Sequence, residues 1–524
     1  MSFKKIASYL KNNLVSILLV IFIVVMFFVG FYDLKYKMAE SGGFIKKIYL
    51  VYSVLLAFLL FIYLMLKNKI KELNDYNIPR IFVITSVIFG SIFLFSSPMF
   101  SGSDEHNHYY RIYEITEGVF VTPTSKYVGS KLPESLEKTF EMGSGNNATI
   151  KYKQIKSMLN IKLDEKNKKQ YGDKWVNSYN NTALYSPVQY FPEIIGFMIG
   201  KILKLNPYII GMFGRIFNLL FYIFIGYIAL KNVPKSKLFY LFILISPNLL
   251  QCATTLSADA FTNVIFLLFI ALIFKEVNSD YMISKKSEVI LLILSIIISL
   301  CKIVYLPVIF LLFLLKNDKF KKGKKGKILF IILTLVMCCS INLIWTGLTT
   351  NIFKVAYDKT ELQKNFIFSH IFEYFIIFIR TFCNQFSLYI ENLFVGTTMY
   401  HSQLHMPSFI SFLYVFIVLI ALLKEKTNFE IKKYSKYLIG VISVIIIGLI
   451  GTAIYIQCTA QFVSIGNSII VGIQGRYFIP IIILLPFLLP KFNVKFNIKN
   501  IDLYNILIGI NIVTILFIFV NFVL

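Results

Sequence analysis

Long apolar runs separated by short polar connections recur along almost the whole chain. Windows such as 14–32 and 49–67 are apolar on every side rather than on one helical face. The composition agrees, with 57% hydrophobic residues, and these runs are as long as a helix that crosses a membrane. The pattern therefore predicts an all-α polytopic membrane protein with about 13 transmembrane helices.

The predicted spans fall into a continuous series with one interruption. We expect them at about 14–32, 48–66, 79–96, 208–230, 238–252, 257–274, 288–315, 328–347, 408–423, 437–457, 468–490 and 501–524. Within 288–315 the sequence CKIVYLP interrupts the apolar run and predicts two half-length helices. Backbone that is not helical is costly in lipid, so we expect Lys302, at this break, to face a cavity.

The strong positive charge is explained by membrane topology rather than by nucleic-acid binding. The net charge is +26, but the lysines cluster in short connections, and seven of them lie in 316–327 alone. Short cytoplasmic loops of membrane proteins are enriched in lysine and arginine. We therefore expect a multi-pass protein of a bacterial cell membrane, with its N-terminus inside and with no nucleic-acid partner.

The spans and the polar segments suggest three parts. Residues 1–78 supply two additional N-terminal transmembrane helices, 79–490 form a transmembrane core, and 491–524 form a C-terminal transmembrane helix. Two long outer loops, 97–207 and 348–407, belong to the core, and the first is expected to carry interfacial helices.

The apolar segment 190–207 at the end of the first loop can either span the membrane or lie at its surface. A span would place the lysine-containing connections 231–237 and 275–288 outside, whereas an interfacial helix places both inside. The distribution of lysines favours the interfacial interpretation.

The second outer loop contains FSHIFEYFIIFIRTFCNQF, in which His370 precedes a run with Glu373 and Arg380 on an amphipathic face. This pattern predicts a second interfacial helix. His401 and His405, further along the loop, are expected to lie on the surface without a chemical role.

The first polar segment, SGSDEHNHYYRIYEITEGVF (101–120), has an unusual density of charge at the edge of a predicted span. Ser103 can cap a helix that Gly118 ends, and on such a helix Asp104, His108 and Arg111 lie on one face. A solvated helix start whose acids suit the helix dipole is the plain interpretation. The cluster follows directly after a span, however, where a cavity between helices would open, and charges within spans are costly and therefore candidates for function.

Several other charged residues are predicted to lie at the same outer side of the membrane. They are Arg215 early in one span, Asp259 at a short turn, Lys302 with Tyr305 at the broken helix, and Arg476 in IQGRYFIP. An acid beside such cations suits a base that deprotonates an acceptor hydroxyl while the cations bind a phosphate leaving group. Each cation taken singly could equally form an interhelical pair or extend toward the interface.

Asp104, Glu105 and His108 could also ligate a divalent cation. One short cluster without a second carboxylate group at a clear spacing does not define a metal site. We therefore predict no cofactor from these residues.

The order of these motifs resembles a known family. The pattern D-E-x-x-H-x-x-R, formed by Asp104, Glu105, His108 and Arg111, is similar to that of an uncharacterised group of bacterial multispanning proteins in the type C glycosyltransferase (GT-C) superfamily. Further matches follow in order over about residues 80 to 490: YSPVQYFPEIIGFMIG, Arg215, SPNLLQCATTLSADA, KIVYLP and QGRYFIP. The chain also looks like a distant relative of aminoarabinose and protein mannosyl transferases, although it has two additional early spans and YSPVQY where those enzymes have paired prolines.

The resemblance implies a polyprenyl-phosphate sugar donor, an extracytoplasmic glycan or lipid acceptor, and inverting transfer. Asp104 would be the base, with Glu105 as the second candidate. His108, Arg111, Arg215, Asp259, Lys302, Tyr305 and Arg476 would form the lipid-phosphate and donor-binding site. The class of enzyme expected is therefore a polyprenyl-phosphate-sugar-dependent glycosyltransferase.

Two other classes remain open from the sequence. A transporter or flippase for a lipid-linked sugar would also need a basic cavity open to the bilayer, but with access from both faces. A structural protein could use the lysine-rich part of the first loop to bind an anionic polymer such as teichoic acid.

Overall fold

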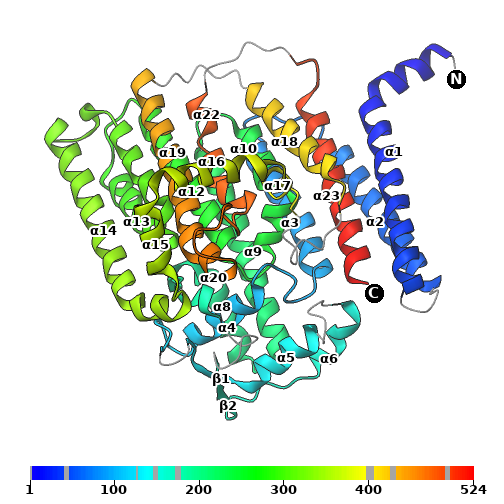
Figure 1. Cartoon of the computed structure of the whole chain (residues 1–524). Helices are drawn as coiled ribbons and strands as arrows, with labels where there is room; N and C mark the ends of the chain where they lie inside the picture. The colour runs from blue at the N-terminus through cyan, green and yellow to red at the C-terminus, as the bar shows by residue number, and fades with distance from the viewer. Residues whose placement is uncertain are drawn as a thin grey trace.

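The structure is a computed structural model and describes residues 3–40, 46–124, 128–144, 151–171, 179–396, 406–424, 432–489 and 496–523. These residues are almost entirely helical (Figure 1). The sheet within them consists of β1 (Lys131–Pro133) and β2 (Lys168–Gln170), which pair antiparallel. The predicted all-α class is thus confirmed.

Eight helices in the described residues are long and apolar enough to cross a membrane. They are α1 (Phe3–Glu40), α2 (Lys46–Lys69), α3 (Ile78–Ser96), α9 (Pro207–Asn232), α12 (Ala258–Asn278), α14 (Gly323–Ala356), α19 (Lys433–Ile454) with its continuation to Phe462, and α23 (Asn500–Phe522). The bent pair α15 (Thr360–Ser369) and α16 (Ile371–Asn384) would make a ninth if it counted as one span.

This number is lower than the expected 13 or so because several predicted spans are divided or short. The segment 238–252 consists of α10 (Lys237–Leu244) and α11 (Pro247–Ala253), which are separated at Ser246. The segment 468–490 contains three single turns: η8 (Gly475–Phe478), α21 (Ile479–Ile482) and α22 (Leu485–Leu488). The helix α18 (Ser408–Leu423) has only 16 residues.

The predicted break in 288–315 is present. The helix α13 (Lys285–Cys301) ends at Lys302, whose backbone is extended, and the 3₁₀ helix η5 (Ile303–Leu314) follows it. η5 packs against α13, α14 and α19, so its weaker backbone geometry is covered by protein.

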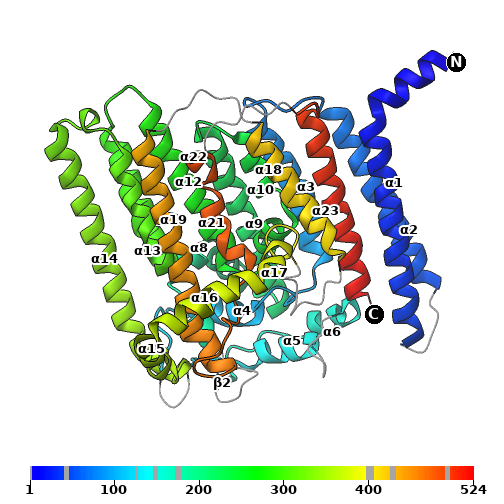
Figure 2. The ribbon, with the colours of Figure 1, turned by 45° about the horizontal axis from the view of Figure 1, so that its top comes forward.

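The first two helices and the last helix of the chain lie side by side at one side of the molecule. α1 and α2 both pack against the C-terminal helix α23, and in Figures 1 and 2 they stand beside it at the margin of the core. Lys37 reinforces this contact because its Nζ donates to the carbonyl of Val520 over 3.1 Å. The additional N-terminal helices are therefore attached to the core through the C-terminal helix.

The lysine-rich connections gather at one end of the helices. Nζ of Lys237 donates to the carbonyl of Asp75 (3.4 Å), and Nζ of Lys275 donates to Oδ1 of Asn232 (2.8 Å). These contacts place the connections after α2, α9 and α12 on one face of the molecule. We call it the lysine-rich face, and we call the opposite face, which carries α4 (Glu105–Thr116) and the β strands, the loop face.

The first polar segment folds into short elements on the loop face. After α4 they are α5 (Glu134–Ser144), the single 3₁₀ turn η2 (Tyr152–Gln154), α6 (Ile155–Leu159), α7 (Asn180–Ala183), η4 (Pro187–Tyr190) and α8 (Phe191–Ile202). They share a tyrosine-rich core, in which the ring of Tyr110 packs on those of Tyr109, Tyr171 and Tyr179.

The segment 190–207 does not form a full span. α8 has 12 residues, so it is about 18 Å long, whereas the hydrocarbon core of a membrane is about 30 Å thick. It packs closely along the first half of α9, where a Cβ atom on Gly196 would meet the backbone of Phe213. This agrees with the expectation that 190–207 does not cross the membrane.

The second outer segment forms α15, α16 and α17 (Phe386–Glu391). α15 and α16 meet at His370 with a bend of 105°. Ile377 and Thr381 face the protein, whereas Phe372 and Phe375 on the other side of α16 are exposed. The amphipathic helix that the sequence predicts is therefore present, and His401 and His405 lie outside the described residues.

Candidate functional site

The carboxylate of Asp259 holds two cations on the loop face. Nζ of Lys302 lies 2.6 Å from Oδ1 of Asp259, and Nε of Arg476 lies 3.0 Å from Oδ2. The three side chains come from α12, the α13–η5 break and η8, which are far apart in the sequence. They retain 14%, 17% and 11% exposure respectively, so the cluster is reachable from outside the protein. Its formal charge is positive by one.

Each member sits where a helix begins or ends. Ser257 caps α12, and its Oγ accepts a hydrogen bond from the backbone N–H of Asp259 (3.2 Å). Lys302 directly follows the last residue of α13 and has extended backbone. Helix ends place charged side chains near the membrane boundary, where the cost of exposing them to lipid is lower.

The position of Arg476 depends on Gly475, the residue before it. A Cβ atom on Gly475 would overlap the carbonyl oxygen of Tyr389, which shows that the backbone of η8 is in contact with the backbone of α17. Asn248 holds the residues that follow α17, because its Nδ2 donates to the carbonyls of Asn392 (3.0 Å) and Leu393 (3.1 Å). The position of Arg476 is therefore set by close backbone packing.

Tyrosine rings surround the cations. Nζ of Lys302 lies 4.9 Å from the centre of the Tyr477 ring and 6.0 Å from that of Tyr185, and the guanidinium of Arg476 lies 5.7 Å from the Tyr477 ring. Tyr305 does not contact the cations through a hydrogen bond; its hydroxyl donates to the carbonyl of Tyr477 (3.0 Å). Tyr305 therefore supports the backbone of Tyr477, whose ring lies beside the two cations.

His108 joins this cluster to α4. Its Nδ1 lies 2.7 Å from the hydroxyl of Tyr190, and its ring stacks on Tyr185 with a centroid distance of 6.0 Å. Burial lowers the pKa of His108 to about 4, and the cations Arg476 and Lys302 act in the same direction, although Asp104 and Asp259 oppose them. His108 is therefore neutral near pH 7.

Asp104 stands immediately before α4 with an exposed side chain. Its φ of 55° lies in the left-handed region, which is unfavourable for a residue with a side chain, although less so for aspartate than for most. Its carboxylate makes no capping hydrogen bond and no ion pair with the described residues. It interacts electrostatically with Arg476, Tyr185 and Tyr357, so it lies within electrostatic range of the cluster. Strained backbone of this kind is concentrated at functional sites.

The neighbouring acid, Glu105, has a different environment. Both of its oxygens accept hydrogen bonds from the guanidinium of Arg215, at 2.6 and 2.7 Å, and the backbone N–H groups of Gly102 and Leu256 donate to it at 2.9 Å. Arg215 also donates to the carbonyls of Ser97 and Pro98. Neither side chain has exposed surface. This pair joins α4, α9 and the turn before α12, and its hydrogen-bonding capacity is taken up by the protein.

Arg111 is likewise committed to the protein. Its guanidinium lies 2.5 Å from Glu114 and donates to the carbonyls of Phe120 (2.6 Å) and Tyr185 (3.3 Å). Glu114 in turn accepts hydrogen bonds from Thr122, Ser130 and Tyr179. Arg111 therefore links the loop-face segments and holds the backbone of Tyr185.

The structure thus separates the predicted site residues into two groups. Asp104, His108, Asp259, Lys302, Tyr305 and Arg476 surround one cluster, whereas Glu105, Arg111 and Arg215 form buried ion pairs beside it. Within the residues that the structure describes, no group of three His, Cys, Asp or Glu side chains could hold a metal ion. The combination of Asp104, Glu105 and His108 does not form because Glu105 faces Arg215.

Several members of the cluster were not predicted individually. Tyr185 and Tyr190 lie in YSPVQYFP, and Tyr477 follows Arg476 in QGRYFIP, so both motifs had been noted without a role for the tyrosines. Asn218 also supports the site, because its Nδ2 donates to the carbonyls of Cys252 and Thr255 just before α12. A polar amide inside an apolar helix was the available signal for Asn218.

The fold and this polar cluster define a multi-pass α-helical membrane protein with a charged site at one end of its helices. Its sequence matches the model of the family described as "Predicted membrane protein (DUF2142)" over residues 87–485, which is more than half of the chain, and the protein belongs to this family. No curated protein and no solved structure matches the sequence.

Proposed function

We propose that the protein is an inverting glycosyltransferase that moves a sugar from a polyprenyl-phosphate donor to a cell-envelope glycan or lipid on the loop face. The lysine-rich face is then cytoplasmic, in keeping with the distribution of positive charge in membrane proteins. The observation that carries the proposal is the cluster of Lys302 and Arg476 on Asp259, with the exposed carboxylate of Asp104 within electrostatic range of it.

The chemistry requires a base and an anion site close together. The acceptor hydroxyl oxygen forms a bond to the anomeric carbon while the bond from that carbon to the phosphate oxygen breaks, and the leaving group is polyprenyl phosphate. Asp104 takes the hydroxyl proton, and Lys302 and Arg476 stabilise the negative charge that develops on the phosphate. A carboxylate can act as base only where the acceptor can reach it, and Asp104, unlike Glu105, is exposed.

The remaining residues serve these two functions. Asp259 keeps the two cations side by side, and the Tyr477 and Tyr185 rings flank Lys302. His108 is neutral and does not add positive charge to the site. The donor enters from the membrane, which suits a cluster at helix ends because its long apolar chain stays in lipid.

The test compares the cell-envelope glycans of cells that carry the wild type, Asp104→Asn or Asp164→Asn at equal membrane abundance. Asp164 is the matched control because it is an exposed aspartate on the same face that bonds only to nearby backbone N–H groups. We expect D104N to lose one sugar from the glycan, as seen by mass spectrometry, while its polyprenyl-phosphate donor accumulates. We expect D164N to match the wild type.

Lys302→Met and Arg476→Met test the phosphate site separately. Each should weaken binding of the polyprenyl-phosphate sugar to the purified protein by about 10-fold or more, because hydrogen bonds to a charged group contribute roughly 1.5–3 kcal/mol. D104N should bind the donor as the wild type does. Unchanged glycans in D104N, K302M and R476M alike would overturn the proposal, whereas movement of the intact donor across the membrane by D104N would favour a transporter.

A further inference from the structure

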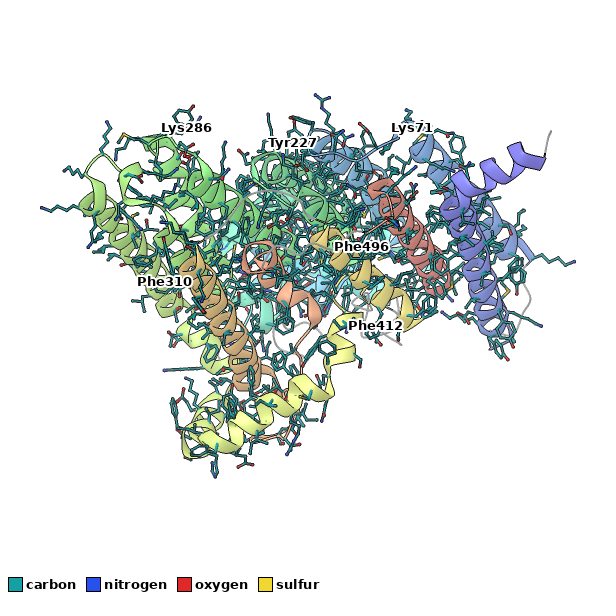
Figure 3. All side chains as sticks on the ribbon, turned by 90° about the horizontal axis from the view of Figure 1, so that it is seen from above. Lys71, Tyr227, Lys286, Phe310, Phe412 and Phe496 are labelled. Atoms are coloured by element: carbon teal, nitrogen blue, oxygen red, sulfur yellow. The ribbon has the colours of Figure 1, made fainter. Side chains whose placement is uncertain are left out.

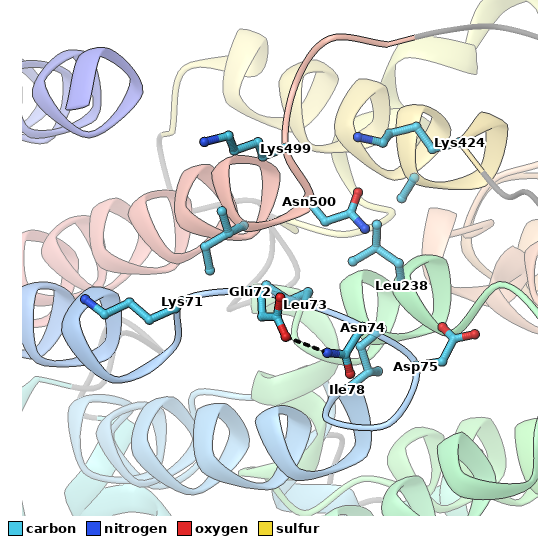
Figure 4. A pocket seen from close by; sticks show the side chains of 12 residues that line it. Lys71, Glu72, Leu73, Asn74, Asp75, Ile78, Leu238, Lys424, Lys499 and Asn500 are labelled. Carbon is cyan, nitrogen blue, oxygen red and sulfur yellow. Dashed lines mark hydrogen bonds between the residues drawn. The ribbon is translucent and has the colours of Figure 1, made fainter. Parts of the chain in front are cut away.

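A cavity of about 540 Å³ opens on the lysine-rich face, at the other end of the helices from the Asp259 cluster. It lies between the α2–α3 connection, the start of α10, the end of α18 and the start of α23. Figure 4 shows Lys499, Asn500 and Lys424 along one side of this cavity and Lys71, Glu72 and Asn74 along the other. Its size is within the range of small-molecule sites.

The polar part of the cavity is positive. Three lysines line it, Lys71, Lys424 and Lys499, against the two acids Glu72 and Asp75. Glu72 accepts a hydrogen bond from Nδ2 of Asn74 at 2.9 Å. Lys424 donates to the carbonyl of Ile498, while Lys71 and Lys499 are exposed and make no ion pair or hydrogen bond with the described residues.

Three helices also begin at this cavity. Ile78 is the first residue of α3, Leu238 is the second of α10, and Asn500 is the first of α23. The first N–H groups of a helix have no partner within it, and the helix dipole is positive at this end. The N–H of Ile78 already donates to the carbonyl of Asn74 (3.1 Å), but the dipoles of the three helix ends together with the lysines still favour an anion, and phosphate groups are common ligands of helix N-termini.

The inner part of the cavity is apolar. Leu73, Ile78, Leu238 and Ala421 line it with side chains that are themselves buried. Inorganic phosphate would gain nothing from these side chains. A membrane lipid, by contrast, combines an anionic headgroup with hydrocarbon, and the cavity is at the ends of spanning helices, where lipid headgroups lie.

We propose that this cavity binds the phosphate headgroup of an anionic membrane phospholipid on the lysine-rich side of the membrane. Lys71 and Lys499 contact the headgroup, and the apolar wall contacts the glycerol and the first part of the acyl chains. This site is separate from the Asp259 cluster and does not rest on the function proposed for it. A failed test here leaves that function unaffected.

The test measures lipid binding by the full chain in an uncharged detergent, by native mass spectrometry with phosphatidylglycerol or phosphatidylcholine. The variants are K71Q/K424Q/K499Q and, as a matched control, K286Q/K321Q/K325Q, which removes three exposed lysines from the same face. Figure 3 shows Lys71 and Lys286 far apart, toward the right and the left of the molecule. A double variant, K71Q/K499Q, keeps the bond from Lys424 to Ile498 in case the triple variant does not fold.

We expect the wild type to prefer phosphatidylglycerol, and the triple variant to bind it at least 10-fold more weakly, because each lysine near an anionic headgroup contributes a factor of about five. The double variant removes both lysines that contact the headgroup and should likewise lose at least about 10-fold on the same basis, and the control should stay within about 2-fold of the wild type. Equal losses in the control would indicate diffuse surface charge and overturn the site, as would equal binding of both lipids. Displacement of the lipid by millimolar inorganic phosphate would assign the cavity to a soluble anion instead.

Discussion

The carboxylate of Glu105 and the guanidinium of Arg215 form two parallel hydrogen bonds, at 2.6 and 2.7 Å, and neither side chain has exposed surface. Four further hydrogen bonds to the backbone of residues 97–102 and 256 satisfy the remaining atoms of the pair. Because α4 precedes α9 by 90 residues, this contact fixes the orientation of α4, and hence the placement of Asp104, relative to the core.

We therefore predict that loss of one partner destabilises the protein strongly. Glu105→Gln or Arg215→Met leaves a buried charge without its partner, which should cost about 3–5 kcal/mol. The measurement is the apparent melting temperature of the purified protein in detergent. The double variant E105Q/R215M should recover part of the loss, because no unpaired charge remains.

The control for this prediction is the ion pair between Glu117 and Lys168, at 2.6 Å, in which both side chains are partly exposed. Lys168→Met should cost less than about 1 kcal/mol. If E105Q and K168M lower the melting temperature equally, the Glu105–Arg215 pair does not support the fold as we infer.

The sequence alone located the charged cluster, but it could not separate the residues that surround the cluster from those that form buried ion pairs beside it. Asp259, Lys302 and Arg476 each lie at an end of a predicted span, and their common side of the membrane follows from the lysine distribution, so their convergence was predictable. Asp104 and Glu105 are adjacent and carry the same charge. The left-handed backbone at Asp104 turns the two carboxylates to different surroundings, one exposed and one buried on Arg215. Nothing in the local sequence determines that choice.

The sequence-based prediction was wrong about the residue that caps α4 and about the number of spans, for related reasons. Ser103 was expected to cap the helix, but Asp104 occupies the capping position and its side chain makes no capping bond. Hydrophobicity likewise marks 238–252 as one apolar run, whereas Ser246 and Pro247 start a new helix within it. Packing against α3, α9 and α18 makes this break tolerable, and such tertiary contacts are not visible in a hydropathy pattern.

Gly475 offers a test of how Arg476 is positioned. Gly475→Ala introduces a methyl group where the backbone of Tyr389 lies, so η8 must move away from α17. We expect a loss of donor binding comparable to that of R476M, since the guanidinium would no longer reach Asp259, together with a lower melting temperature. Gly347, on the lipid-facing part of α14, has no atom near its Cβ position, so Gly347→Ala is the matched control and should change neither quantity. Wild-type binding in G475A would show that the contact does not position Arg476.

The pKa of His108 predicts a pH-dependent stability. Burial lowers this pKa from 6.5 to about 4, so the unfolded chain binds a proton between these values and the native protein does not. Stability is therefore complete above pH 6.5 and decreases as the pH falls toward 4, by about 3 kcal/mol at most. His108→Asn should flatten the dependence of the melting temperature on pH between 7.5 and 4.5.

His106→Asn is the control for that measurement. His106 lies on the same helix, is less buried than His108, and stacks on Phe140 with a centroid distance of 4.6 Å. We expect H106N to keep the slope of the wild type. A slope that persists in H108N would assign the pH dependence to another group.

The arrangement of the two faces predicts which positions are accessible from each side of the membrane. In a background in which the exposed Cys339 and Cys383 are replaced by alanine, single cysteines at Lys231, Lys286 and Lys138 report on the connection after α9, the start of α13 and the loop face. All three lysines are exposed.

Because α8 is too short to span, Lys231 and Lys286 should react from the same side, and Lys138 from the other. A membrane-impermeant maleimide on intact cells should label only Lys138→Cys, since the lysine-rich face is cytoplasmic under our proposal. Labelling of Lys231→Cys together with Lys138→Cys would mean that 190–207 crosses the membrane, and labelling of Lys231→Cys and Lys286→Cys without Lys138→Cys would reverse the orientation.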